Sequence, residues 1–272
     1  MMTTLTNPRN PHVRQARQLQ QRKVRDETGL FVVEGLRHVG EAAAAGAAIE
    51  YLCYAPDLLR SPFGRELVEA QVAAGRRAYA LAADVFRSIA AKDNPQGLLA
   101  VVRRPNPGLA DLRPAEHNWL VALVSPQDPG NIGTVIRTMD AVGAGGLILL
   151  DGGADPTHPN AVRASLGALF WMPVVSATFA DFLPWARGAG YQLCGTSEKG
   201  TMDYRSAAYR RPVILLMGSE REGLAPEQEA ACDLMVRLPM AGRVTSLNLA
   251  VATGVMLYAM RARFEAGGQA PA

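Results

Sequence analysis

Short apolar runs alternate with helical segments throughout the second half of the chain, and this pattern leaves few choices of fold. The runs WLVALV, GLILL, MPVVS, YQLCGTS, PVILLMGSE and LMVRLPM are each typical of a strand, and segments such as IGTVIRTMDAV and NAVRASLGALF between them are typical of helices. Strands this apolar indicate a mostly parallel sheet that is buried on both faces. We therefore predict an α/β domain that ends in the long apolar-striped helix SLNLAVATGVMLYAMRARF.

The first hundred residues repeat the alternation on a smaller scale. LFVVEG, IEYLCYA, RAYAL and GLLAVVRR predict strands, and segments such as LRHVGEAAAAG predict helices. The stretch from Arg103 to Asn118 carries three prolines among polar residues, which is typical of a linker. We predict a small α/β domain over residues 1–104, a linker over 105–117 and a second domain over 118–272. A chain of 272 residues that is 49% hydrophobic can build two such cores.

Composition narrows the class of protein. The net charge is +3, and arginine supplies most of the cations, which permits a phosphate-bearing partner. The three cysteines lack CxxC spacing and the four histidines form no ligand motif, so we expect neither a disulfide framework nor a metal site. The start has no apolar signal core, and no apolar run approaches the roughly 20 residues that span a bilayer. We expect a cytoplasmic protein without a membrane partner.

A basic arm precedes the first predicted strand and is expected to form a short helix. Arg14 and Arg17 are three residues apart and would share a helix face. Two interpretations stay open: a solvated helix face, or an arm that contacts RNA phosphates and is sensitive to salt. The cations of this arm are Arg9, Arg14, Arg17, Arg22, Lys23 and Arg25, of which Arg9, Arg14, Arg17 and Arg22 are the candidate RNA-binding residues.

The loop between WLVALV and the next helix resembles the start of a nucleotide-binding βαβ unit. A dinucleotide fingerprint needs G-x-G-x-x-G there and an acidic residue about 20 positions later. Asp151 suits the acidic position, but the loop offers only Gly130 and Gly133, with Asn131 between them. Gly143, Gly145 and Gly146 are expected at the helix end as a cap and turn. A nucleotide-dependent oxidoreductase is therefore disfavoured.

Two later loops also follow apolar strands. GSEREGLAPEQ places Gly218 directly after a strand, where a ligand can approach the backbone, and Glu220 close behind it. Pro226 is expected to begin a helix. PMAGRVTSLNLA places Ser246 and Asn248 at the head of the last helix, and Ser246 is the expected N-cap. The carboxyl ends of parallel strands meet at one sheet edge, so these loops predict one ligand site.

The three loops carry a resemblance to a known family. NIGTVIRTMDAVGA, GSEREGL and LPMAGRVTSLNLAVATG, in this order, resemble the three motifs of the SpoU (TrmH) family of RNA ribose methyltransferases. FVVEGLRHVGEA and DNPQGLLAVV are similar to the family's N-terminal substrate-binding domain, which has an L30e-like α/β fold. One departure is Leu249-Ala250, where many members have a small apolar residue and a serine.

The resemblance implies a fold, a reaction and a partner. It implies a C-terminal α/β-knot domain, with a trefoil knot in a mostly parallel sheet, that works as a homodimer. The methyl donor is S-adenosylmethionine, no metal is needed, and the acceptor is a ribose 2′-hydroxyl of structured RNA, with rRNA favoured over tRNA by fold analogy. The donor would lie against Gly195, Thr196, Gly218, Leu238, Met240, Ser246 and Leu247. The catalytic candidates are Arg137, Asn131, Glu220, Ser246 and Asn248.

Two questions stay open at this point. Arg137 could act as a base or could stabilise a developing oxyanion, and the second role is favoured because a guanidinium is a poor base. The same scaffold could also serve a catalytically silent RNA-binding protein. The presence of all five catalytic candidates disfavours that alternative.

Overall fold

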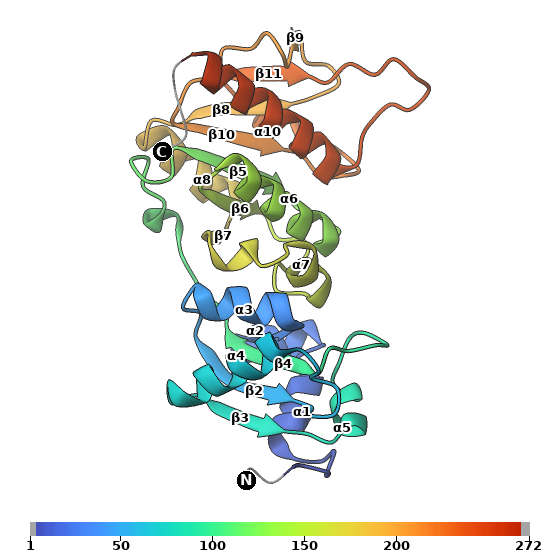
Figure 1. The fold of residues 1–272 in the computed structure, drawn as a ribbon. Helices are drawn as coiled ribbons and strands as arrows, with labels where there is room; N and C mark the ends of the chain where they lie inside the picture. The colour runs from blue at the N-terminus through green and yellow to red at the C-terminus, as the bar shows by residue number, and fades with distance from the viewer. Residues whose placement is uncertain (1–3, 268–272) are drawn as a thin grey trace. The chain divides into compact units, whose positions relative to one another are not determined.

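The computed structural model describes residues 4–267, which divide into two compact units (Figure 1). Unit 1 contains the residues up to Pro105 together with Asp155–Trp171. Unit 2 contains Asn106–Ala154 together with the residues from Met172 onward. The segment Asp155–Trp171 therefore packs in the N-terminal unit, although the sequence places it inside the second predicted domain. The predicted linker packs with unit 2, where Leu112 is buried in the core.

Unit 1 is built on a four-stranded mixed sheet in the order β1-β4-β2-β3. The pairs β1–β4 and β2–β4 are antiparallel, and β2–β3 is parallel. The four predicted strands of this half are confirmed. The elements of unit 1 are α1 (Pro11–Gln18), α2 (Arg22–Thr28), β1 (Leu30–Glu34), α3 (Leu36–Ala44), β2 (Ile49–Tyr54), α4 (Pro62–Ala73), β3 (Arg77–Ala80), α5 (Ala83–Arg87), β4 (Leu98–Arg103), α7 (Pro159–Ala164) and the 3₁₀ turn η2 (Ala168–Phe170).

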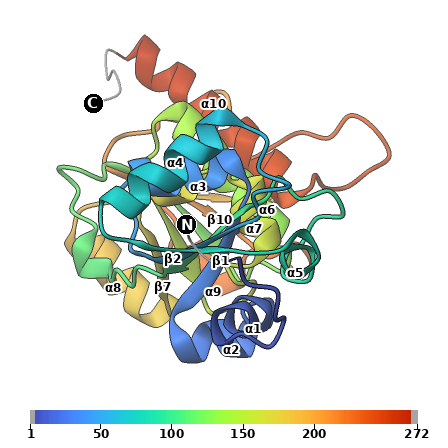
Figure 2. The same cartoon turned by 60° about the horizontal axis from the view of Figure 1, so that its bottom comes forward.

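Both faces of the unit 1 sheet are covered, because successive strand residues point to opposite sides. Val32 of β1 joins a cluster that α1 and α5 complete, whereas Val33 joins a second cluster with α3, α4 and α7. Figure 2 shows α1 and α5 on one side of β1 and β2 and α3 and α4 on the other. Val162 of α7 belongs to the second cluster, which explains why its segment packs here.

The N-terminal arm differs from its prediction as a single short helix. It forms two helices, α1 and α2, and Asn10 caps α1 by accepting from the His12 amide. The expectation that Arg25 is one of the arm's outward cations is wrong, because Arg25 is only 1% exposed. Arg9, Arg14, Arg17 and Arg22 are exposed as expected.

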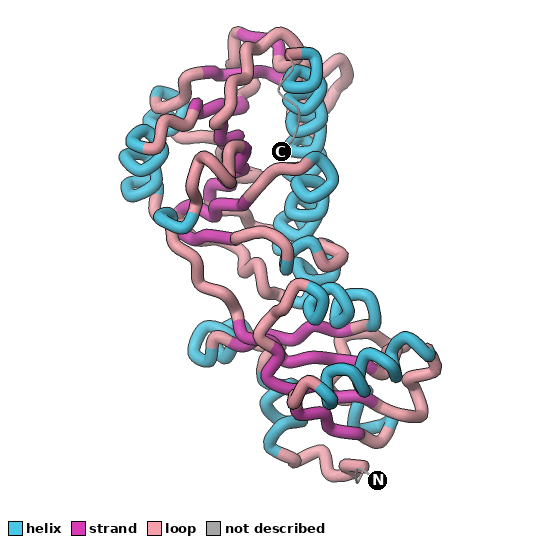
Figure 3. The backbone as a smooth tube through the Cα atoms, turned by 60° about the vertical axis from the view of Figure 1, so that its left-hand side comes forward, coloured by secondary structure: helices cyan, strands magenta, loops and turns pink. Residues whose placement is uncertain are grey.

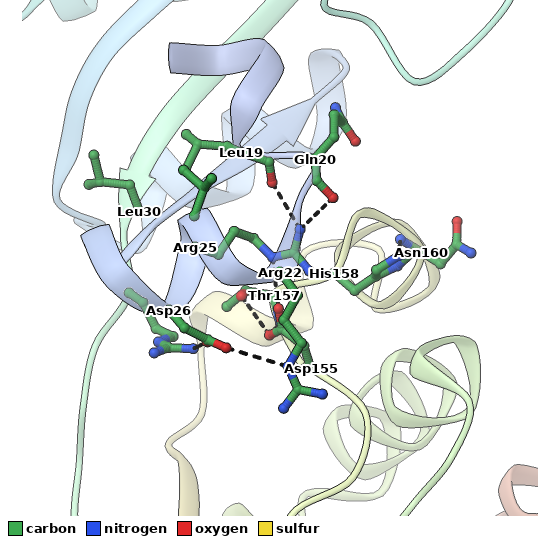
Figure 4. A network of polar contacts seen from close by, with 12 residues as sticks. Leu19, Gln20, Arg22, Arg25, Asp26, Leu30, Asp155, Thr157, His158 and Asn160 are labelled. Carbon is green, nitrogen blue, oxygen red and sulfur yellow. Dashed lines mark hydrogen bonds and ion pairs between the residues drawn. The ribbon is translucent and has the colours of Figure 1, made fainter.

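Arg25 instead forms a buried ion pair with Asp155 (Figure 4). Its Nε lies 2.7 Å from Asp155 Oδ2, and its Nη1 donates to the carbonyl oxygens of Leu19 and Gln20 at 2.9 Å each. Asp155 Oδ1 accepts from the amide and the hydroxyl of Thr157, both at 2.7 Å. Both oxygens of Asp155 and two nitrogens of Arg25 are thus hydrogen-bonded, which ties Asp155–Trp171 to α1 and α2 within unit 1.

Unit 2 contains a seven-stranded sheet in the order β7-β6-β5-β10-β8-β11-β9, and all its strand pairs are parallel. The predicted α/β class and mostly parallel sheet are confirmed, and the sequence reasoning missed only the short β9. The elements of unit 2 are the 3₁₀ turn η1 (Leu109–Asp111), β5 (Trp119–Val124), α6 (Pro129–Val142), β6 (Gly146–Leu150), β7 (Val174–Ala177), α8 (Phe179–Gly188), β8 (Gln192–Thr196), β9 (Met202–Asp203), β10 (Val213–Met217), α9 (Pro226–Ala230), β11 (Leu234–Arg237) and α10 (Leu249–Ala266).

Helices cover both faces of this sheet, as Figure 3 shows for unit 2. Phe182 and Ala186 of α8 pack on one face, and α6 and α10 pack together on the other.

No helix within residues 4–267 is long and apolar enough to cross a membrane. The trefoil knot stays a prediction, because strand order and pairing do not by themselves define the threading.

Local signals place the helix starts near the predicted ligand site. Asp128 caps α6 by accepting from the Gly130 amide, and Pro226 begins α9 as predicted. Gly143 ends α6 with φ of +78°, as expected for a cap glycine. The predicted N-cap Ser246 is wrong: Asn248 caps α10 by accepting from the amides of Ala250 and Val251.

Candidate active site

A large cavity opens at the carboxyl edge of the unit 2 sheet. It has a volume of about 540 Å³ and is formed by the segments that follow β8, β10 and β11. These strands are parallel neighbours, so their carboxyl ends lie side by side. The lining residues are Thr196–Lys199, Met217–Leu224, Pro226, Glu229, Leu238, Met240, Thr245–Leu247, Leu249 and Ala252. Three loops that are distant in sequence thus form one pocket of the size that small ligands occupy.

The wall that follows β10 is a tight backbone turn. The amides of Ser219 and Gly223 donate to each other's carbonyl oxygens at 3.1 Å, and Gly223 has φ of +70°. A Cβ on Gly218 would lie 2.1 Å from the carbonyl carbon of Gly223 and 2.4 Å from the amide nitrogen of Leu224. Position 218 therefore needs glycine, because any side chain would push this turn apart.

The charge of the pocket favours a cationic ligand. Its acidic lining residues, Glu198, Glu220, Glu222 and Glu229, outnumber its cations, Lys199 and Arg221. Apolar side chains such as Met217 and Leu238 supply the remaining surface. A ligand that combines a positive charge with a flat apolar group suits this combination.

A hydrogen-bonded network joins the loop after β10 to the starts of α6 and α10. Asn131 Nδ2 donates to Glu220 Oε1 at 3.1 Å, and Asn248 Nδ2 donates to Asn131 Oδ1 at 3.0 Å. The Gln127 amide also donates to Glu220, at 3.1 Å to Oε2. Because Asn248 also caps α10, its amide is held in a single orientation. The network therefore fixes Asn131 and Glu220 beside the pocket.

Arg137 lies on α6 outside this network. Its side chain is exposed, and within residues 4–267 it takes part in no hydrogen bond or ion pair. It projects from the same helix that carries Asn131 near its start. An exposed guanidinium remains available for a polyanionic ligand.

The structure brings most of the predicted donor residues into one place. Thr196, Gly218, Leu238, Met240, Ser246 and Leu247 all line the cavity. Gly195 does not line it and is buried instead, where an added Cβ would lie 2.6 Å from Met235 Sδ. Sequence reasoning missed Glu198 and Lys199, although they directly follow a predicted strand at the same sheet edge.

The four candidate RNA-binding arginines are not equivalent. Arg17 donates to Ser88 Oγ at 2.7 Å and to the Ser88 carbonyl at 3.3 Å. Arg22 lies 3.5 Å from Asp26 in an exposed ion pair. These contacts orient two of the four side chains and leave their surroundings open to solvent.

Among the described residues, no group of three His, Cys, Asp or Glu side chains could hold a metal ion.

The fold and the pocket define a class of protein, an α/β enzyme-like chain with a small-ligand site at the carboxyl edge of a parallel sheet. Two family models match the chain: the SpoU rRNA Methylase family over residues 118–258 and the MRM3-like substrate binding domain over residues 10–100.

Characterised relatives and a solved structure cover almost the whole chain. A 23S rRNA uridine 2′-O-methyltransferase from Streptomyces viridochromogenes is 35% identical over 87% of this chain and 84% of its own length. A 23S rRNA guanosine 2′-O-methyltransferase from Bacillus subtilis (strain 168) is 29% identical over 96% and 100%. The AdoMet-bound rRNA methyltransferase from Sinorhizobium meliloti is 39% identical, with a TM-score of 0.88 over 96% of this chain and 98% of that one. The chain belongs to the SpoU rRNA methylase family.

Proposed function

We propose that this chain is an S-adenosylmethionine-dependent RNA methyltransferase that methylates a ribose 2′-hydroxyl of structured RNA. The observation that carries the proposal is the pocket lined by two of the three family motifs, residues 218–224 and 238–254, to which Glu220 and Asn248 join Asn131 of the first motif by hydrogen bonds. Relatives that span nearly the whole chain are 2′-O-methyltransferases of 23S rRNA, so rRNA is the proposed substrate, in preference to tRNA. A substrate of this kind favours a cytoplasmic location.

The pocket suits the methyl donor. The donor carries a cationic sulfonium and an ammonium group, which match the excess of glutamates in the lining. Gly218 lets the backbone turn after β10 line the pocket closely, and Leu238, Met240 and Leu247 can contact the adenine ring. Thr196 and Ser246 supply hydroxyl groups to the donor site. Gly195 contributes indirectly, because its lack of a side chain lets Met235 pack closely against the end of β8. The bound sulfonium supplies an activated methyl group without a metal.

The acceptor side requires alignment of a weakly acidic hydroxyl and stabilisation of the charge that develops on its oxygen. Arg137 binds the adjacent RNA phosphate and stabilises the developing oxyanion, since an exposed guanidinium presents several N–H donors to oxygen atoms. Asn131 orients the ribose, because Glu220 and Asn248 hold its amide from both sides. Ser246 shapes the loop that faces the donor.

RNA is held by unit 1. Arg9, Arg14, Arg17 and Arg22 contact phosphates, which positions the RNA without reading its sequence. The match of residues 10–100 to a substrate-binding domain supports a role for unit 1 in RNA binding and for unit 2 in donor binding.

The direct test is methyl transfer from labelled donor to unmodified rRNA by the purified full-length chain. The product should carry the label on a ribose, seen as one alkali-resistant dinucleotide, because a 2′-O-methyl group blocks cleavage by base. A chain that binds donor and rRNA but transfers no label would be a catalytically silent RNA-binding protein. Label on a base would contradict the proposed acceptor.

The chain is also proposed to form a homodimer through unit 2. Val251, Val255 and Tyr258 recur at helical spacing along α10 and are 53%, 36% and 55% exposed. Val244 and Leu247 extend this apolar stripe along the preceding loop, and a second cavity of about 380 Å³ lies beside it. Leu238, Met240 and Leu247 line both cavities, so the stripe continues to the donor pocket. A second copy of unit 2 would cover this surface.

Replacing both Val251 and Val255 with lysine is expected to give a monomer in sedimentation velocity, since burying two ammonium groups opposes association. The matched control is Phe63→Lys, which removes a side chain of similar exposure, 52%, from unit 1 and should leave the dimer intact. A monomeric wild-type chain, or a double variant that still dimerises, would contradict the proposal.

A further inference from the structure

A second, much smaller cavity lies wholly within unit 1 and plays no part in donor binding. Its volume is about 30 Å³, and it lies between the end of β1, the loop after α5 and helix α7. The lining residues are Gln20, Val32, Glu34, Ala91, Lys92, Pro159, Val162 and Arg163. A space of this size admits one or two water-sized groups and excludes an aromatic ring.

Glu34 gives this cavity an acceptor that is not satisfied by the protein. Its Oε2 accepts from the Ala91 amide at 2.7 Å. Its Oε1 is buried, and no hydrogen-bond donor among residues 4–267 reaches it. Burial raises the pKa of Glu34, and the hydrogen bonds from the Ala91 and Lys92 amides, together with the charges of Lys92 and Arg163, partly oppose that rise. A buried carboxylate oxygen without a partner is costly, and an incoming hydrogen-bond donor would remove that cost.

The surroundings of Glu34 narrow the class of that donor. Lys92 and Arg163 line the same cavity and add positive charge beside the carboxylate. A ligand that fits must present a hydrogen-bond donor at its tip and negative charge on its body. A lysine or arginine from a protein partner meets the first condition but is repelled by the two cations. A nucleotide meets both, because cytosine, adenine and guanine carry an exocyclic amino group and the RNA backbone carries phosphate.

We propose that this cavity receives the exocyclic amino group of an unpaired cytosine, adenine or guanine in the RNA substrate, with Glu34 Oε1 as the acceptor. Only the edge of the base enters, and Val32, Pro159 and Val162 offer apolar contact to it. Lys92 and Arg163 hold the phosphates on either side. The inference rests on the proposed RNA methyltransferase function and adds a specificity residue far from the donor pocket in sequence.

Glu34→Gln makes a sharp test, because the Ala91 amide still requires an acceptor. The glutamine oxygen is expected to take over that hydrogen bond, which turns the amide N–H₂ group toward the cavity. The variant thus replaces an acceptor by a donor with almost no change in shape. Its preference should move from bases that carry an amino group to uracil, which presents a carbonyl oxygen.

The measurement is fluorescence anisotropy of the full-length chain with labelled cytidine and uridine RNA octamers. The wild-type chain is expected to bind the cytidine octamer about tenfold more tightly, and Glu34→Gln should abolish or reverse that preference. The matched control is Lys92→Ala, which should weaken both octamers by the same factor because phosphate contacts carry no base information. Equal wild-type affinities, no measurable binding, or an unchanged preference in Glu34→Gln would each overturn the inference.

A second probe needs no variant and so does not depend on the folding of Glu34→Gln. An adenosine octamer and its purine-riboside counterpart differ only in the exocyclic amine, and the wild-type chain should bind the first about tenfold more tightly. Neither assay uses donor or turnover. A chain that prefers amino-bearing bases but transfers no methyl group would therefore refute the proposed function alone, and a working methyltransferase without this preference would refute only the inference.

Discussion

Arg137→Ala is expected to lower the rate of methyl transfer by at least about 10²–10³-fold while the donor binds with unchanged affinity. Arg137 lies outside the donor pocket and outside the Glu220–Asn131–Asn248 network, so its loss disturbs neither. In the proposed mechanism the variant loses the positive charge that stabilises the developing oxyanion, and removal of one such group has effects of this size. Single-turnover transfer with saturating donor measures the rate, and calorimetry measures donor affinity.

The matched control for this experiment is Arg113→Ala. Arg113 is also an exposed arginine of unit 2, and it pairs with its neighbour Glu116 at 2.7 Å. Its removal should leave the rate within about twofold, since an exposed ion pair of this kind contributes little. If Arg137→Ala keeps full activity, Arg137 has no part in the mechanism. If the Arg137→Ala variant loses donor binding as well, the role of Arg137 is structural.

Arg25→Ala is expected to destabilise the full-length chain by about 3–5 kcal/mol. The substitution would leave the Asp155 carboxylate buried without its cation and would free the carbonyls of Leu19 and Gln20. Chemical denaturation measures the change. Arg103→Ala is the control, because the Arg103–Glu50 pair is exposed and its loss should cost no more than about 1 kcal/mol. Equal effects of the two substitutions would contradict this account of the buried pair.

The same pair predicts an acid dependence of stability. Burial by itself raises the pKa of Asp155, but the hydrogen bonds from Thr157 and Arg25, together with the charge of Arg25, outweigh it and lower the pKa below the usual 3.8. A carboxylate whose pKa is depressed in the folded state contributes stability above its unfolded pKa and loses it as the pH falls through the folded value. The wild-type chain should thus lose stability below about pH 4, and Arg25→Ala should lose less of it there.

Much of the fold could be predicted from local signals. Apolar runs defined the strands, and the parallel order brought the loops at Gly218 and Leu238 to one sheet edge, where a single pocket is found. Pro226 and Gly143 marked a helix start and a helix end correctly, because their backbone preferences act within a few residues.

The errors arose where distant residues decide the outcome. Arg25 resembled the other cations of the arm, and only its pairing with a residue 130 positions away buries it. Serine and asparagine are both good N-cap residues, so Ser246 and Asn248 were both candidates for the start of α10. The hydrogen bond from Asn248 to Asn131 favours Asn248 as the N-cap. The cavity at Glu34 depends on α7, which is contributed by a segment from the other half of the sequence. No periodicity or spacing in the sequence encodes such a contact.

Titration calorimetry of S-adenosylmethionine with the purified chain tests most directly whether the segments that follow β8, β10 and β11 form one donor site. The wild-type chain should bind one donor per chain, and Gly218→Ala should weaken binding by more than about tenfold, because a Cβ there would displace the turn at Gly223. Gly242→Ala is the matched control, since a Cβ at position 242 meets nothing within 4 Å and the affinity should not change. No binding by the wild-type chain, or wild-type affinity in Gly218→Ala, would contradict the account.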